Sequence, residues 1–443
     1  MRSVLLLLSL LGSLAAQSAA PPRSWTVLVY GGSDNDSEES FCPDIQKLRT
    51  ALPDSGTDEA ARVAVLCLVD RSAKYSDSRT GFGSDFSGAR LYELTREGAR
   101  QIDPGDAMPQ LAATTVDSGD PALVRDFLRY AKRHYPAEHT ALVFYSHGNG
   151  AQWCPDESHG THLTAAGLSA ALAERDRVDL MVFDVCEMAA LADAYQWRPR
   201  EGAFAADVVV ATPMAGFPLP WRRIMRHVAG AADAQVFARA IIEETKAHRA
   251  SSQEESLPEH VRRVIDREAM AALDLGRVEA AARAVHGLAR ALAVDPGARE
   301  RLLALRRDGP VMTYARDYVD IYDLARRIVA GGFGEPVARA ADEVSAAVDA
   351  LVVESYGMTG YAAAGGFRAG QSGVHLVFPE VGAEPATLWR RLRWYLPEAD
   401  PAAGLGFALL AAGAQPGDGV VDNWFELLDA WLDDDADHNG YRY

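Results

Sequence analysis

The sequence predicts an α/β fold in which a mostly parallel β-sheet is flanked by helices. Short apolar runs rich in β-branched and aromatic residues recur along the chain, and such runs are typical of strands buried on both faces. Segments with helical periodicity separate these runs, at the length of a parallel crossover unit. The chain has 443 residues, 48% of them hydrophobic, which is enough for one large domain or two moderate ones.

The first half of the chain alternates predicted strands with predicted helices. One helix is expected from Pro121 to His134, because Asp120 is a good N-cap and proline is favoured at the first helical position. A second is expected from Thr164, as N-cap, to about Arg175, and a third over 188–195. The strands are expected at 26–30, 62–70, 141–148, 180–186 and 207–212, with 89–94 as an edge strand or hairpin arm.

The composition changes near residue 229. From 234 to about 352 the chain is rich in Ala, Arg and Glu with helical periodicity, and we predict no strand there. One further strand is expected at 373–379. We therefore divide the chain into an N-terminal segment, 1–20, an α/β domain, 21–235, and a largely helical C-terminal extension, 236–443, that ends in an acidic tail.

The N-terminus has the layout of a secretory signal peptide. Met1-Arg2 precedes an apolar run, 4–14, and the small residues that follow allow cleavage after Ala20. The run is too short to span a bilayer, and no later segment reaches that length. The sequence therefore predicts a secreted or periplasmic protein without a membrane anchor.

Charge and cysteine content restrict the partners and the covalent cross-links. The net charge of −18 argues against nucleic acid and anionic membranes as partners, since both need a basic surface. We expect a monomer.

Four cysteines are too few for a disulfide scaffold in a chain of this length. If Cys186 is a working thiol, at most one bridge forms among Cys42, Cys67 and Cys154.

Two reactive side chains follow the ends of two predicted strands. His147 ends the run at 141–148 and Cys186 ends the run at 180–186. In an open α/β sheet, ligands bind at the carboxyl ends of the strands. A thiol attacks a carbonyl group as thiolate and needs a base nearby, which His147 can supply. The pattern therefore predicts nucleophilic catalysis, which requires no cofactor.

The residues alone leave other interpretations open. Cys186 can be a buried structural thiol and His147 a hydrogen-bonded turn residue. Cys154, His159 and His162 crowd the loop after His147, and thiol and imidazole suit zinc, although their spacing matches no common zinc motif.

The acidic tail resembles half of a calcium loop. Residues 435–441 place oxygen-bearing side chains at alternate positions and Gly440 at the turn, as in the first half of an EF-hand loop. The chain ends before a glutamate at position 12. We therefore favour a plain acidic tail over a calcium site.

Several motifs together resemble the clostripain family of cysteine peptidases. They are Asp120-Pro121 with the helix 124–130, Tyr135-Pro136-Ala137, His147-Gly148-Asn149-Gly150, and Phe183-Asp184-Val185-Cys186-Glu187-Met188. The resemblance runs from about 25 to 230 and returns at the strand 373–379. It implies a caspase-like fold, shared with caspases, gingipains and legumains.

The resemblance also implies roles for individual residues. His147 would be the general base, Cys186 the nucleophile, and the backbone N–H groups of Gly148 and Cys186 the oxyanion hole. Asp184 would form the floor of a pocket that selects Arg or Lys at P1, since a partly buried carboxylate needs a cationic partner. Relatives usually carry a second acidic or polar residue after the strand equivalent to 207–212; residues 213–221 of this chain include none, and Met214 predicts a more apolar pocket wall.

We therefore expect an exported cysteine endopeptidase that acts on proteins or peptides. Some relatives are activated by cleavage between the His and the Cys, and Arg175 and Arg177 are the candidate sites here. The rival functions are a catalytically inactive binding protein on the same scaffold and a zinc-dependent hydrolase that uses Cys154, His159 and His162.

Overall fold

The computed structural model describes residues 23–75, 77–251, 259–308, 311–315, 317–363, 366–379 and 420–432. The predicted signal peptide, 1–20, and the acidic tail, 433–443, lie outside the described residues. Export and the calcium loop therefore stay predictions.

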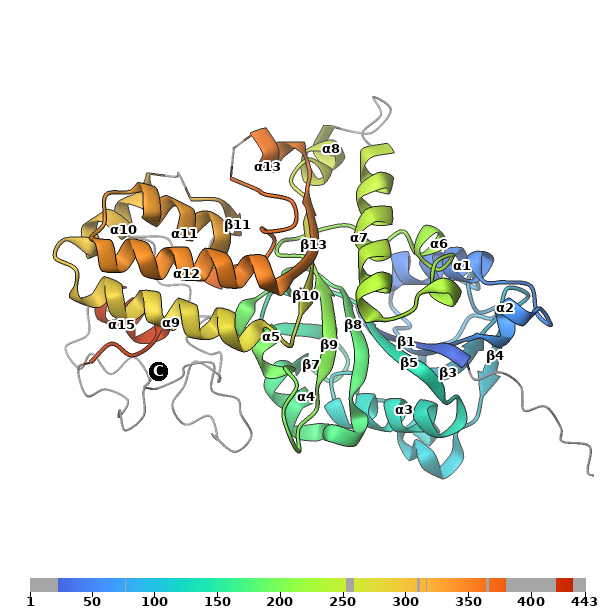
Figure 1. Ribbon diagram of the computed structural model, residues 1–443. Helices are drawn as coiled ribbons and strands as arrows, with labels where there is room; N and C mark the ends of the chain where they lie inside the picture. Colours follow the sequence, from blue (N-terminus) through green and yellow to red (C-terminus); the bar gives the residue numbers. More distant parts are fainter. Residues whose placement is uncertain are drawn as a thin grey trace, which may run out of the picture.

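A nine-stranded sheet forms the centre of the described part of the chain (Figure 1). Its order is β13-β10-β9-β8-β5-β1-β2-β3-β4. The five strands from β9 to β2 in this order run parallel to one another, while β10 with β13 and β3 with β4 form antiparallel edges. The bounds are β1 (Arg23–Ser33), β2 (Val63–Arg71), β3 (Gly88–Leu94), β4 (Ala99–Ile102), β5 (Ala137–Tyr145), β8 (Val178–Asp184), β9 (Ala206–Ala211), β10 (Ala269–Asp274) and β13 (Val352–Gly357).

The middle parts of the central strands are largely apolar, and helices cover both faces of the sheet. Alternate residues of β8 point to opposite faces, so Met181 and Phe183 enter one core while Leu180 and Val182 enter the other. This explains why the run at 180–186 lacks the polar alternation of a half-exposed strand.

Two helical layers enclose the sheet (Figure 1). One contains α1 (Glu38–Ala51), α6 (Trp221–Ile224) and α7 (Ala234–Ser251). The other contains α3 (Pro121–His134), α4 (Ala165–Ala171) and α5 (Leu191–Gln196). The later helices pack mainly on one another in a group to the left of β10 and β13 in Figure 1, and the same apolar core joins them to α5; they are α9 (Val278–Val294), α10 (Ala298–Arg307), α11 (Ile321–Ala330), α12 (Glu335–Leu351) and α15 (Trp424–Leu432). The remaining short helices are α2 (Asp58–Ala61), α8 (Glu259–Ile265), α13 (Thr359–Ala363), η1 (Gly105–Ala107), η2 (Pro109–Ala112), η3 (Glu174–Asp176) and η4 (Val228–Gly230).

Both predicted N-caps are confirmed. The Asp120 carboxylate accepts a hydrogen bond from the N–H of Ala122 at 2.8 Å, and the Thr164 hydroxyl accepts one from the N–H of Gly167 at 3.0 Å. The helix after Thr164 is shorter than predicted, since α4 ends at Ala171 and η3 follows it.

The predicted absence of strands between 234 and 352 is wrong. β10 lies within that range, and β13 begins where it ends; both belong to the central sheet. The β10 sequence, Ala-Met-Ala-Ala-Leu-Asp, favours a helix by intrinsic propensity, and its pairing with β9 and β13 overrides that preference. The sheet therefore continues across the predicted boundary at residue 235.

Two small sheets lie beside the large one in the described residues. The hairpin β6 (Gln152–Asp156) and β7 (Thr161–Thr164) follows the strand of His147. The other sheet has the order β11 (Thr313–Ala315), β12 (Tyr318–Asp320) and β14 (His375–Val377), which confirms a strand within 373–379.

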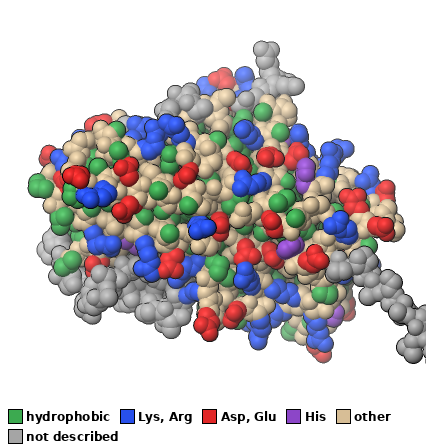
Figure 2. All heavy atoms as spheres, viewed as in Figure 1, with side chains coloured by type: hydrophobic (Ala, Val, Ile, Leu, Met, Phe, Trp, Pro, Cys, Tyr) green, Lys and Arg blue, Asp and Glu red, His purple; other side chains and the backbone are tan. Residues whose placement is uncertain are grey.

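The surface carries both signs of charge. Acidic and basic side chains are interspersed over the face shown in Figure 2. Within the described ranges, none of the helices combines the length and the apolar character that a bilayer crossing demands.

Candidate active site

The register of two neighbouring strands brings His147 and Cys186 together. β5 and β8 run parallel, with Tyr145 paired to Asp184 as the last partners. His147 and Cys186 each stand two residues beyond that pair, so the loops leave the sheet side by side. Both residues line one cavity of about 220 Å³ at the carboxyl edge of the sheet.

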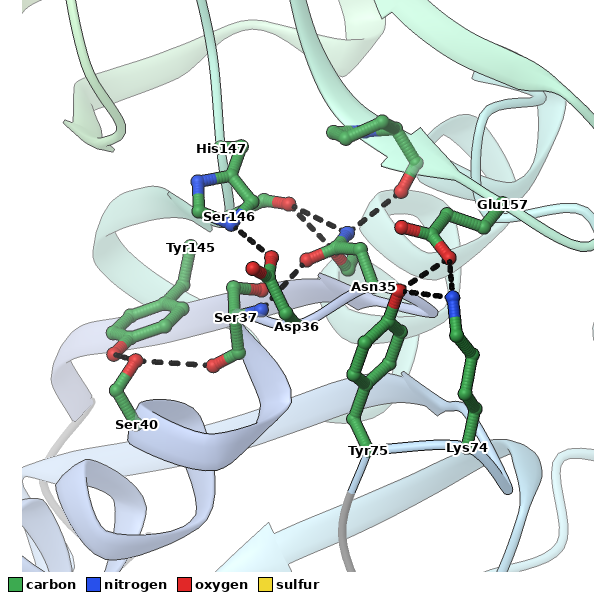
Figure 3. Close-up of polar contacts among 12 residues, drawn as sticks. Asn35, Asp36, Ser37, Ser40, Lys74, Tyr75, Tyr145, Ser146, His147 and Glu157 are labelled. Carbon is green, nitrogen blue, oxygen red and sulfur yellow. Dashed lines mark hydrogen bonds and ion pairs between the residues drawn. The ribbon is translucent and has the colours of Figure 1, made fainter.

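The imidazole of His147 has a carboxylate partner. Its Nε2 lies 2.6 Å from Oδ1 of Asp36, which follows β1, the neighbour of β5 (Figure 3). Both side chains are more than half exposed. No role was predicted for Asp36 from the sequence, although the acidic turn directly after the first strand was an available signal.

Asn35 holds Asp36 next to the histidine. Its amide Nδ2 donates to the carbonyl of Gly32 at 2.9 Å, to that of Pro155 at 2.7 Å and to the Ser146 hydroxyl at 3.3 Å. Its Oδ1 accepts from the N–H of Ser37 at 3.0 Å (Figure 3). Asn35 is buried, and these hydrogen bonds connect the end of β1 to the loop that carries His147.

Cys186 stands in a strained turn and keeps its proton at rest. Burial raises the pKa of its thiol, a hydrogen bond from the Gly216 N–H to the sulfur lowers it, and the Glu187 and Asp184 carboxylates raise it further. Glu187, the next residue, has a φ of +63°, in the left-handed region that non-glycine residues rarely adopt. Such strain is common where a turn aims a functional side chain.

Gly148 allows the loops that carry His147 and Cys186 to approach each other. A Cβ there would lie 2.3 Å from Cγ1 of Val185 and 3.1 Å from the carbonyl oxygen of Cys186. Any larger residue would therefore push the loops apart. Within the described residues, the N–H groups of Gly148 and Cys186 donate to no protein acceptor.

Asp184 lines the same cavity and is almost completely buried, with 8% exposure. Its carboxylate accepts hydrogen bonds from the Leu219 N–H, at 3.0 and 3.2 Å to its two oxygens, and from the indole N–H of Trp221 at 2.7 Å. Burial nevertheless raises the pKa of Asp184 to about 7, since desolvation outweighs these bonds.

Met214 is not a wall of this cavity, contrary to the prediction. It packs against Tyr361, whose hydroxyl lies 3.2 Å from its sulfur. The apolar lining consists of other residues: Phe183, Val185, Phe217, Pro218 and Met270. Met270 belongs to β10 and was missed because that strand was not predicted.

A buried ion pair supports the cavity wall from behind. Nη2 of Arg249, on α7, donates to the carbonyls of Phe217 and Pro218 at 2.8 and 2.9 Å. Nε of the same guanidinium lies 2.8 Å from both carboxylate oxygens of Glu268. Both side chains are almost completely buried, and nothing in their local sequence signals this contact.

The model of the clostripain family, peptidase C11, matches residues 29–393 of this chain. The chain belongs to the clostripain family. It is therefore a cysteine peptidase of that family, and both the resemblance and the predicted fold class are confirmed.

Known clostripain-family proteins resemble most of the chain. It is 26% identical to clostripain from Hathewaya histolytica over 94% of this chain and 88% of that protein. A secreted C11 cysteine protease from Bacteroides thetaiotaomicron, solved with an irreversible peptide inhibitor, shares the fold with a TM-score of 0.57 and 18% identity, over 84% of this chain and 98% of the other. The fold is also similar to that of an inactive zymogen C11 protease from Parabacteroides distasonis, with a TM-score of 0.55 and 15% identity, over 76% of this chain and 85% of the other.

The zinc ligands considered from the sequence do not come together in this family member. His159 instead lies beside Asp34 and Asp156, with the potential ligand atoms all within 4.8 Å of one another. Among the described residues, no such group contains Cys154 or His162. Asp156 already accepts bonds from the N–H and Nδ1 of His159. Cys154 is buried, with its Cβ and sulfur against Gly32.

All four cysteines of this clostripain-family chain are free thiols. Cys42, Cys67 and Cys154 are buried, while Cys186 is partly exposed. Burial raises the pKa of Cys42 to about 11 and raises those of Cys67 and Cys154 as well. Cys186 is thus the thiol that a substrate can reach.

Proposed function

We propose that this cysteine peptidase is an exported endopeptidase that cleaves proteins or peptides through His147 and Cys186, after Arg or Lys at P1. One observation carries the proposal: the His147 imidazole and the Cys186 thiol follow neighbouring parallel strands, the Asp184 carboxylate ends one of these strands, and all three groups line one cavity.

The geometry supports general-base activation of the thiol. Asp36 accepts a hydrogen bond from Nε2–H of His147, which leaves Nδ1 unprotonated and able to take the thiol proton. The sulfur then forms a bond to the carbonyl carbon, and the π electrons move to the oxygen. As this intermediate collapses, the imidazolium returns the proton to the leaving amine, and water hydrolyses the acyl-enzyme in the same way.

The N–H groups of Gly148 and Cys186 are the proposed oxyanion hole. Neither has an acceptor among the described residues, so both can donate to the negative oxygen of the tetrahedral intermediate. Gly148 also lets the substrate backbone come close.

The cavity suits a long cationic side chain. Phe217, Pro218 and Met270 can contact the aliphatic stem of Lys or Arg, and Asp184 can meet its charge. The bonds from Leu219 and Trp221 hold the Asp184 carboxylate in place before substrate binds. This arrangement makes Asp184 the main determinant of a basic P1 residue.

Export is inferred from the signal-like segment at 1–20, and a secreted relative with the same fold agrees with it. We propose that the enzyme acts as a monomer and that the proposed chemistry needs no metal or other cofactor.

Fluorogenic peptides that differ at P1 test this function. Wild type should hydrolyse Arg and Lys peptides, Cys186→Ala should be inactive, and the matched control Cys67→Ala, a buried thiol of β2, should stay active. Absence of hydrolysis by the wild type would favour a binding protein. Turnover that survives Cys186→Ala and is lost with a zinc chelator would favour a zinc hydrolase.

A further inference from the structure

The small sheet β11-β12-β14 reaches the back of both catalytic loops. Its strand β14 forms a parallel bridge between His375 and Ala190, just beyond the Cys186 turn, with the His375 N–H donating to the carbonyl of Ala189 at 3.0 Å. Its strand β12 places Tyr318 against the loop that follows His147. One structural unit late in the chain therefore contacts the supports of both reactive groups.

His375 forms a hydrogen bond with Glu187, the strained residue next to the proposed nucleophile. It is completely buried, and its Nε2 lies 3.0 Å from the carbonyl oxygen of Glu187. Because a carbonyl only accepts, Nε2 carries the proton and donates. Burial lowers the pKa of His375 to about 4, so the ring stays a neutral donor at neutral pH. The bond holds the left-handed backbone of Glu187.

Tyr318 contacts the other catalytic loop and the same histidine. Its hydroxyl donates to the carbonyl of Asn149 at 3.3 Å, and its ring stacks on His375 with centroids 4.2 Å apart. A Cβ on Gly150, which has a φ of +80°, would lie 2.6 Å from the Tyr318 hydroxyl and 3.0 Å from the Glu187 carbonyl oxygen. The two loops and the tyrosine therefore meet at Gly150.

We propose that His375 and Tyr318 are positioning residues that fix the Cys186 turn and the His147 loop relative to each other from behind. This proposal rests on the proposed roles of His147 and Cys186. Neither residue lines the cavity in which the substrate side chain is proposed to bind. Their loss should misplace the thiol, the imidazole and the oxyanion-hole amides while substrate binding is largely retained.

Three substitutions test the proposal with Arg-P1 peptides. His375→Leu removes the donor and should lower kcat roughly 10- to 100-fold with KM nearly unchanged, the usual scale for misplaced reacting groups. His375→Gln offers an N–H at a similar reach and should restore most of kcat. Tyr318→Phe removes only the hydroxyl and should lower kcat by a smaller factor without affecting folding.

A second readout does not depend on peptide hydrolysis. The alkylation rate of Cys186 by iodoacetamide near neutral pH should fall in His375→Leu and recover in His375→Gln. If the wild type alkylates at Cys186 but hydrolyses no peptide, the proposed function fails while the positioning role can still be tested.

His286→Leu is the matched control. His286 is also buried, with 1% exposure, but lies on α9, where its Nδ1 accepts from the N–H of Trp424. It should lower the melting temperature without changing kcat or alkylation per folded molecule. The proposal is overturned if His375→Leu keeps wild-type kcat, if His375→Gln is as impaired as His375→Leu, or if the control shows the same losses. If His375→Leu does not fold, an unchanged kcat and alkylation rate in Tyr318→Phe overturns it.

Discussion

The preference for a basic P1 residue should depend on pH through Asp184. Burial raises the pKa of this carboxyl to about 7, so it is largely protonated below that pH and ionised above it. Only the ionised form offers a full charge to Arg or Lys. Selectivity for a cation should therefore rise as the pH increases through about 7 and level off above it.

The size of the effect follows from that pKa. With a pKa of about 7, roughly one tenth of Asp184 is ionised at pH 6 and roughly nine tenths at pH 8. The selectivity for Arg over citrulline, its neutral isostere, should therefore rise up to about tenfold between these pH values. Substituting one partner of a buried charge pair typically costs about 2–5 kcal/mol, so Asp184→Asn should lower kcat/KM for Arg by at least about 30-fold.

The assay measures kcat/KM for matched Arg and citrulline peptides from pH 5.5 to 8.5. Protonation changes that act equally on both substrates cancel in the ratio. Asp184→Asn is a mild change, because its side-chain oxygen can still accept from Trp221 and Leu219. A high ratio that does not vary with pH, or a variant that keeps the wild-type profile, would refute the assignment of Asp184.

Three further predictions concern the residues around the site. Asp36→Asn should lower kcat by no more than about fivefold, because exposed ion pairs contribute about 0.2–1 kcal/mol; a loss clearly above fivefold in steady-state kinetics would contradict this. Arg249→Met should lower the free energy of unfolding, measured in urea, by about 3–5 kcal/mol, because it leaves the buried Glu268 carboxylate without its cationic partner. An unchanged urea midpoint would show that the ion pair is dispensable. Self-cleavage after Arg175 or Arg177 is not expected, because the backbone carbonyls of both residues accept hydrogen bonds from Lys132. Mass spectrometry of wild type and Cys186→Ala should show the same intact chain. A fragment found only in the wild type would disprove this prediction.

Local sequence patterns were sufficient for the parallel core. The runs at 141–148 and 180–186 are apolar on both faces, and only strands covered by helices on both sides combine that pattern with their length. Parallel neighbours end at the same edge, so His147 and Cys186 could be placed together without coordinates. The caps at Asp120 and Thr164 were predictable because they depend on contacts two or three residues away.

Local patterns misled where the tertiary environment overrides propensity. β10 is composed mainly of alanine, leucine and methionine, and pairing with β9 and β13 makes it a strand. Met270 therefore lines the cavity although the sequence did not predict it. Met214, which is closer to Cys186 in sequence, does not line the cavity.

The sequence by itself determined the family, the central parallel strands and the positions of the thiol and imidazole at one edge of the sheet. The tertiary structure alone decided which groups support them: Asp36 beside His147, Arg249 with Glu268 behind the cavity wall, and His375 against the Cys186 turn. Periodicity and capping arise from neighbours within a few residues, whereas these contacts join segments tens to hundreds of residues apart, which only the folded chain brings together.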